Sequence, residues 1–286
     1  MNLRGIRQRI RSVQSTQKIT RAMQMVAGAK LRRAQGELMA FRPYADALEK
    51  MTQRFLRDHP GLEHALLAET TTEAPAGLIV VTSDTGLCGT YNEKVLAAAE
   101  GFLRENPSAL LVTIGKKAAR RFTRLGVPRA REILDWGGRY DHAKAGVLLE
   151  WLEEQFMTGK VSGWSIAYTQ FLSALSWRPM VKGLVPLEQV EQPAAGANYV
   201  PEKVIVEPDV PRFAEALVRE SVRTRFGRAL LEGFTSEHSA RMMAMKNATE
   251  NASDLISNLT LVRNKVRQAA ITKELIEVVS GAQALQ

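Results

Sequence analysis

The feature that most constrains this chain is a long C-terminal stretch without proline. No proline follows Pro211, so residues 212–286 contain no residue that must break a helix. At ~1.5 Å per residue, a continuous helix over this stretch would be about 110 Å long. A globular domain of ordinary size cannot contain such a helix, and we therefore expect one of its ends to project.

Apolar residues along this stretch recur with the spacing of a coiled coil. Alternating steps of three and four residues place them on one stripe of a supercoiled helix. Alanine is frequent on the stripe, which permits a partner helix to approach closely, and Asn258 falls off it. Only Lys273 interrupts the predicted stripe, which comprises Met245, Ala248, Ala252, Leu255, Leu259, Val262, Val266, Ala269, Lys273 and Ile276.

The N-terminal residues 1–57 show a similar pattern with one apparent break. A first stripe is formed by Leu3, Ile6, Ile10 and Val13, and the pattern resumes at Ile19, Ala22, Val26 and Ala29. The gap between them indicates a stutter in the heptad repeat. Two glycines, Gly28 and Gly36, each cost a helix about 1 kcal/mol relative to alanine, which favours a closely packed neighbour. We therefore predict an antiparallel coiled coil between the two ends of the chain.

The middle of the chain alternates between strand and helix patterns. Apolar runs predict strands at residues 77–82, 110–114, 164–171 and 180–187, and helical spacing predicts helices at 93–103, 116–125 and 144–156. Such alternation indicates a Rossmann-like α/β domain with a largely parallel sheet. We predict four regions: an N-terminal coiled-coil helix (1–57), a middle α/β domain (75–190), an irregular connection (191–211) and a C-terminal coiled-coil helix (212–286).

Positive charge is concentrated at the two ends of the chain. Residues 1–57 hold 13 Lys/Arg against 3 Asp/Glu, whereas residues 58–211 hold 15 against 19. A basic segment suits nucleic acid, an anionic membrane or an acidic protein surface, and composition alone does not choose among them. The N-terminus has no apolar core of a secretory signal, and no stretch reaches the ~18 apolar residues of a membrane span.

Candidate catalytic groups do not form a recognisable active site. The loop at residues 83–92 (SDTGLCGTYN) is glycine-rich and joins a strand to a helix, but it matches neither the dinucleotide fingerprint nor the P-loop. The four histidines lack metal-ligand spacing. We expect Ser236, His238 and Ser239 to lie on a surface helix rather than to act as a nucleophile and base. The sequence predicts no cofactor, no metal ion and no catalysis by this chain alone.

Three segments resemble the gamma subunit family of the rotary ATP synthases. Residues 17–35 (QKITRAMQMVAGAKLRRAQ) are similar to that family's N-terminal motif, and residues 236–285 are similar to its C-terminal signature. The loop TSDTGLCGTYN resembles a third motif, in which Thr85 replaces the family's usual basic residue. The resemblance runs in order through the whole chain.

The resemblance implies a central rotor shaft that couples ion flow to catalysis on other subunits. Alpha and beta subunits would surround the coiled coil, and the α/β domain would meet the epsilon subunit and the membrane ring of c subunits. The shaft would be a peripheral protein on the cytoplasmic side of a bacterial inner membrane. By position and charge, the resemblance makes Arg32 and Arg33 candidates for contact with the beta subunits. The further candidates for coupling or interaction are Met23, Val26, Val262, Ile276 and Leu285.

Two other classes of protein remain as alternatives at this point. A nucleic-acid-binding protein with a basic helical arm would bind duplex with steep salt dependence. An α/β enzyme with a helical dimerisation arm would need a phosphate loop or an acid/base pair. The sparse aromatic residues disfavour the first, and the absence of such motifs disfavours the second.

Overall fold

The computed structural model describes residues 3–67, 73–187 and 205–283. Its contacts divide the chain into two compact units. The helical-pair unit comprises Met1–Gly28 and Arg241–Gln286, and the sheet unit comprises Ala29–Ala240. Two helices, α1 (Leu3–Asp58) and α5 (Val210–Gln283), contribute to both units.

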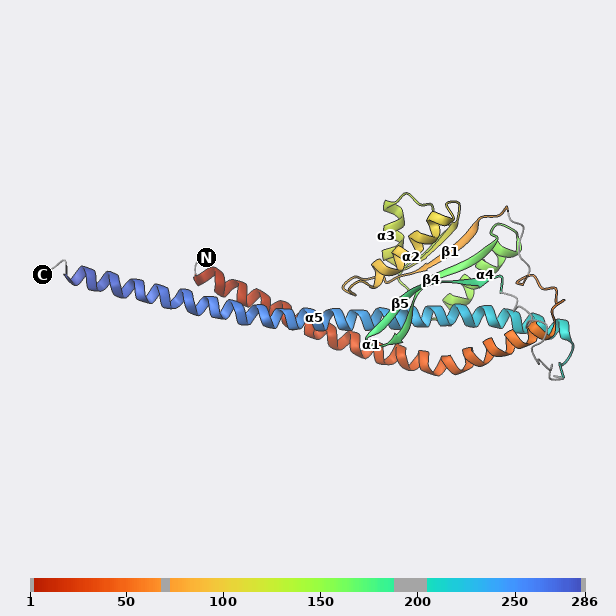
Figure 1. Cartoon of the computed structure of the whole chain (residues 1–286), viewed down its shortest axis with the longest axis horizontal. Coiled ribbons are helices and arrows are strands. Elements are labelled where there is room, and N and C mark those ends of the chain that lie inside the picture. The colour runs from red at the N-terminus through yellow and green to blue at the C-terminus, as the bar shows by residue number, and fades with distance from the viewer. Residues whose placement is uncertain (1–2, 68–72, 188–204, 284–286) are drawn as a thin grey trace, which may run out of the picture. The chain divides into compact units, whose positions relative to one another are not determined.

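In the helical-pair unit, α1 and α5 lie side by side and run in opposite directions (Figure 1). Gln17 Nε2 donates to Ser253 Oγ at 2.6 Å, and three residues later Thr20 bonds Thr249 through their hydroxyls at 2.8 Å. Partners on α5 thus come earlier in the chain as α1 advances. The predicted antiparallel pairing of the two chain ends is confirmed.

The contact face of α5, called the seam below, differs in phase from the predicted stripe. Met245, Ala252 and Leu259 are buried as predicted, but Leu255 and Val262 are 40% and 46% exposed. Ile256, the residue after Leu255, faces α1 instead of Leu255. It packs against the cluster of Ile6, Ile10 and Leu259. The sequence does not reveal this phase, because the polar residues Thr249 and Arg263 occupy two positions of the seam.

The predicted stutter in α1 is wrong, because polar residues occupy seam positions on this helix too. Gln17 and Thr20 are half-buried seam residues, and the heptad continues through them to the buried Ala27 and Leu31. Their side chains hydrogen-bond to hydroxyls of α5, which satisfies polar groups between the helices. The residues that were expected to resume the stripe are instead exposed on the opposite face of α1: Ile19, Ala22, Val26 and Ala29.

The two glycines of α1 also differ. A Cβ added at Gly28 would lie 3.6 Å from Met242 Sδ, so Gly28 does have the close neighbour that was expected. At Gly36 an added Cβ would meet no atom within 4 Å. Pro43 lies inside α1, which continues through it. Proline removes one backbone donor there, and this cost is tolerated because the helix packs along its length in both units.

The sheet unit contains five strands in the order β3-β2-β1-β4-β5. The pairs β3–β2, β2–β1 and β1–β4 are parallel, and β5 pairs antiparallel with β4 at one edge. The largely parallel sheet was predicted, whereas the short strand β3 and the start of β5 at Ser176 were not. The elements are β1 (Ala76–Val81), α2 (Tyr91–Glu105), β2 (Leu110–Ile114), α3 (Lys116–Arg124), β3 (Arg131–Ile133), α4 (His142–Met157), β4 (Gly163–Ser173) and β5 (Ser176–Val185).

Alternate residues of the strands point into two different apolar cores. Ile79 and Val81 of β1 pack in the larger core with α4 and with buried residues of α1 and α5. Leu78 and Val80 point to the other face, which α2 and α3 cover. The sheet unit is therefore a three-layer α/β/α sandwich in which parts of α1 and α5 belong to one layer (Figure 1). No helix in the described residues is long and apolar enough to cross a membrane.

Candidate functional site

The glycine-rich loop after β1 is closed by its own side chains. Asp84 accepts hydrogen bonds from the backbone N–H groups of Lys116, Asp135 and Gly137 at 3.1–3.2 Å. A carboxylate therefore occupies the first N–H of α3, at Lys116, which a phosphate at this helix terminus would use. The side-chain amide of Asn92 accepts from the backbone N–H of Ser83 at 3.0 Å and donates to the Ser83 hydroxyl at 2.8 Å. This network supports the prediction that the loop is a structural turn.

A glycine completes the neighbouring turn between β2 and α3. Gly115 has φ +94°, and a Cβ there would lie 2.2 Å from the backbone oxygen of Thr82. The Thr82 hydroxyl in turn accepts from the N–H of Ala118 at 2.9 Å. Gly115 is thus required by close approach of backbone, and it makes no phosphate-binding loop.

The predicted surface position of the Ser-His-Ser segment is wrong. Ser236 and Ser239 are fully buried, and His238 is only 4% exposed. The hydroxyl of Ser236 donates to the carbonyl of Thr169, and that of Ser239 donates to the carbonyl of Ala174. These side chains join α5 to β4 at Thr169 and to the turn between β4 and β5 at Ala174. They do not face each other as a nucleophile and a base.

A charged group lies at the junction of α1, α5 and the sheet. Glu232 is fully buried, and its Oε1 lies 3.4 Å from Arg42 Nη2 and 3.3 Å from Arg228 Nε. Arg42 also donates to the carbonyl of Phe171 at 2.5 Å. Burial raises the pKa of Glu232 above its ordinary value, while the two arginines oppose that shift. Sequence reasoning missed this group, although a lone acid in the apolar run ALLEGF was a usable signal.

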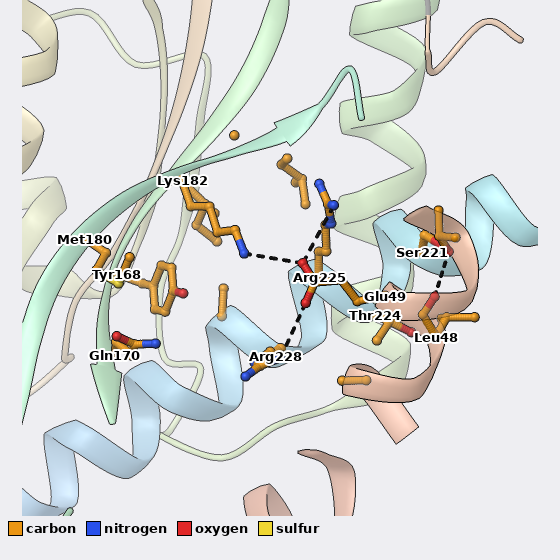
Figure 2. A pocket seen from close by; sticks show the side chains of 16 residues that line it. Leu48, Glu49, Tyr168, Gln170, Met180, Lys182, Ser221, Thr224, Arg225 and Arg228 are labelled. Carbon is orange, nitrogen blue, oxygen red and sulfur yellow. Dashed lines mark hydrogen bonds and ion pairs between the residues drawn. The ribbon is translucent and has the colours of Figure 1, made fainter. Parts of the chain in front are cut away.

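A cavity of about 120 Å³ adjoins this junction. Figure 2 shows Glu49 of α1 between Lys182 of β5 and two arginines of α5, Arg225 and Arg228. Their nitrogen-to-oxygen distances to Glu49 are 3.7–3.8 Å. Burial raises the pKa of the nearby Tyr168 hydroxyl to about 12, so that it remains protonated. The ion pairs hold both helices against the sheet and resemble no acid/base pair.

The residues proposed for coupling contacts lie mostly on exposed surface. In the helical-pair unit, Val26 is 58% exposed, Val262 is 46% exposed and Ile276 is 60% exposed, whereas Met23 is half-buried. In the sheet unit, Arg32 and Arg33 are exposed, and Arg33 pairs with Glu37 one turn along at 3.4 Å. Leu285 lies outside the described residues.

Two exposed apolar surfaces occur in the helical-pair unit. The first is the α1 stripe of Ile19, Ala22 and Val26, which points away from the seam. The second is the end of α5: after the half-buried Val266, every residue from 267 to 280 is exposed. Sequence reasoning identified Ile276 there but not its neighbours. The additional large apolar residues of the second surface are Ile271, Leu275, Val278 and Val279.

The apolar stripe of α1 is accompanied by positive charge. Residues 1–36 contain nine Lys/Arg and no Asp/Glu. Large exposed apolar groups mark binding surfaces, and a basic surround selects an acidic partner. Among the described residues, no group of three His, Cys, Asp or Glu side chains could hold a metal ion. The exposed apolar and basic faces of α1 and α5 have the character of contact surfaces.

Comparison with known proteins gives one consistent family. The family described as ATP synthase matches residues 2–285. The ATP synthase gamma chain of Symbiobacterium thermophilum is 37% identical over 287 residues, covering 100% of this chain and 99% of that protein. That of Moorella thermoacetica is 39% identical over 289 residues, with the same coverage.

Solved structures share the fold. A chain in the cryo-EM structure of the Euglena gracilis mitochondrial ATP synthase, OSCP/F1/c-ring in rotational state 3, gives a TM-score of 0.67 at 20% identity. It covers 99% of this chain and 94% of that one. A chain of the Tetrahymena thermophila mitochondrial ATP synthase central stalk and c-ring gives a TM-score of 0.60 at 24% identity, covering 80% and 99%.

Proposed function

The chain belongs to the gamma-chain family of the ATP synthases, and from that premise we propose that it turns as a shaft and does no chemistry of its own. A gamma chain is the central rotor of a rotary ATP synthase. Catalysis would take place on the alpha and beta subunits that surround α1 and α5. The exposed apolar and basic faces of the paired helices would be the surfaces through which torque passes.

The observation that carries this proposal is the separation of two faces on each helix. The seam joins α1 to α5 through Ile6, Ile10 and Leu259. Away from the seam, Val26 and Val262 remain 58% and 46% exposed although they are apolar. A shaft needs an inner face that keeps its helices together and an outer face that contacts other subunits in turn. Torque requires that these outer contacts differ in strength between rotational states.

The two exposed surfaces suit different partners. The basic α1 face of the helical-pair unit fits an acidic portion of the beta subunits, and so do the exposed Arg32 and Arg33 of the sheet unit. The end of α5 beyond Glu277, where residues 278–283 carry no charged side chain, fits an apolar bearing together with the exposed Ile276, because strong ion pairs there would favour one rotational state. The candidate residue Leu285 belongs with this bearing. We assign Met23, half-buried beside the seam, to support of the outer face.

The sheet unit is proposed to contact the epsilon subunit and the ring of membrane-embedded c subunits. The assembled shaft would lie at the cytoplasmic side of a bacterial inner membrane as a peripheral protein. The bacterial relatives with 37% and 39% identity support this location. The four predicted regions of the chain are retained as part of the proposal.

Reconstitution with alpha and beta subunits tests the proposal directly. We expect the full chain to co-purify with both subunits and to be required for ATP-driven ion pumping by the complete enzyme in inverted vesicles. If the chain instead binds duplex with an affinity that falls steeply with salt, and does not assemble with alpha and beta, it is a nucleic-acid-binding protein and the proposal fails.

A further inference from the structure

A second charged cavity, of about 320 Å³, lies beside α3 in the sheet unit. One wall is the turn at residues 86–89, and another is the start of α2 with Asn92 and Glu93. The third wall consists of basic residues of α3: Lys117, Arg120, Arg121 and Arg124. One carboxylate therefore faces four cationic side chains in this cavity.

The fold forces these four cations together. They follow the spacing i, i+3, i+4 and i+7, which places them on one face of the helix. The opposite face of α3 cannot turn outward, because Ala118 and Phe122 are fully buried against the sheet. Like charges at these spacings destabilise a helix. A bound anion would remove that repulsion.

Three of these four cations form no ion pair with the part of the chain that the structure describes. Arg121 pairs with Glu100 at 2.7 Å. Within residues 3–67, 73–187 and 205–283, no ion pair is formed by Lys117, Arg120 or Arg124. Asp84 is the carboxylate nearest in sequence to the turn at residues 86–89. It is already held by three backbone N–H groups on the other side of that turn.

The cavity also brings cations and backbone close together. The ammonium of Lys117 lies so near the turn that a Cβ added at Gly86 would be 3.4 Å from its Nζ. Leu87 follows in the left-handed region at φ +61° and is 62% exposed. A compact anion in this hollow would contact Lys117 and the arginines of α3 at once.

We propose that this cavity binds a compact polyanion with phosphate chemistry, such as a di- or triphosphate group. Arginine presents a planar fork of donors that matches phosphate oxygens, and three arginines line the cavity. A hollow suits such a group better than it suits a flat acidic protein surface. Glu93 is the one carboxylate that lines the cavity, so the cavity offers few ligands for Mg²⁺. Mg²⁺ would also neutralise the negative charge of the anion that the cations attract, and the anion therefore binds without it. This site is independent of the proposed shaft function.

Titration calorimetry of the full chain with sodium tripolyphosphate tests the site. The variant Arg120→Gln/Arg124→Gln removes the charges of two exposed side chains that line the cavity. The matched control, Lys50→Gln/Lys160→Gln, removes two exposed charges elsewhere in the same unit. We expect wild type and control to bind alike and the α3 variant to bind about tenfold more weakly, a loss that corresponds to ~1.4 kcal/mol. Binding should weaken when Mg²⁺ or salt is added.

A second titration, with vesicles of phosphatidylglycerol and phosphatidylcholine, distinguishes a lipid headgroup from a free phosphate compound. Binding to either probe that depends on Arg120 and Arg124 supports the site and identifies the source of the phosphate group. Equal losses in the α3 variant and in the control would show a general charge effect and overturn the site. Failure of wild type to bind either probe would overturn it too. Neither result would affect assembly with alpha and beta subunits, which tests the shaft.

Discussion

Replacement of Leu259 by alanine tests which face of α5 forms the seam with α1. Leu259 is 8% exposed and is the α5 member of the cluster with Ile6 and Ile10. Truncation of a buried leucine to alanine costs about 2–5 kcal/mol. The neighbouring Val13 and Val266 are only partly buried, so the gap can close in part, and we expect a value near 2 kcal/mol.

Val262→Ala is the matched control, three residues along the same helix. Val262 is 46% exposed, so only part of its side chain leaves an apolar environment. Alanine also has a higher helix propensity than valine by up to ~0.7 kcal/mol, which offsets this small loss. We expect the control to change the unfolding free energy of the isolated chain by less than ~0.5 kcal/mol.

Hydrogen exchange and thermal melting of the full chain measure this difference. Leu259→Ala should accelerate exchange of backbone amides in the helical-pair unit, because the opening of paired helices becomes easier. In the reconstituted enzyme the same variant should retain some ATP hydrolysis but pump ions poorly, since the proposed function assigns catalysis to other subunits. Equal effects of both variants on exchange and melting would show that the seam does not pass through Leu259, and the helical pairing described above would have to be abandoned.

Three further outcomes are expected. The pure chain should show no Mg²⁺-dependent ATP site of micromolar affinity by calorimetry and no ATP hydrolysis; detection of either would revive the enzyme alternative. Arg32→Glu/Arg33→Glu should weaken ATP-driven pumping partially, by ~0–1 kcal/mol per exposed contact, and salt should shrink the effect; unchanged pumping at low ionic strength contradicts the contact. Because burial raises the pKa of Glu232, this carboxyl group binds its proton more tightly in the folded state than in the unfolded state. Its contribution to the unfolding free energy is therefore complete below pH ~4.5 and is lost as the pH rises through the raised pKa. Unfolding free energies measured from pH 4 to 7.5 should therefore fall less steeply in Glu232→Gln than in wild type, and parallel curves would refute the assignment.

The sequence by itself determined the elements of the chain and their order. The absence of proline after Pro211 predicted a long helix, and in the structure this helix extends from Val210 to Gln283. Continuous apolar runs located β1 and β2, because both faces of a covered parallel sheet are buried. The three-residue strand β3 carried too little pattern to be seen, and the strand predicted at residues 180–187 missed the first four residues of β5, which include Pro179. Proline is tolerated there because β5 is an edge strand.

Which residues face a partner was decided only by the tertiary structure. Both α1 and α5 carry apolar residues on two faces, so periodicity alone could not distinguish the seam from the outer face, and Val262 was placed on the wrong one. Polar seam residues such as Gln17 and Thr20 look like solvent positions in a sequence, yet hydroxyls on the opposite helix satisfy them. Glu232 is buried for the same reason, since Arg42 reaches it from 190 residues away. A hydrogen-bond partner distant in the chain changes the cost of burying a polar group, and only the folded structure supplies that partner.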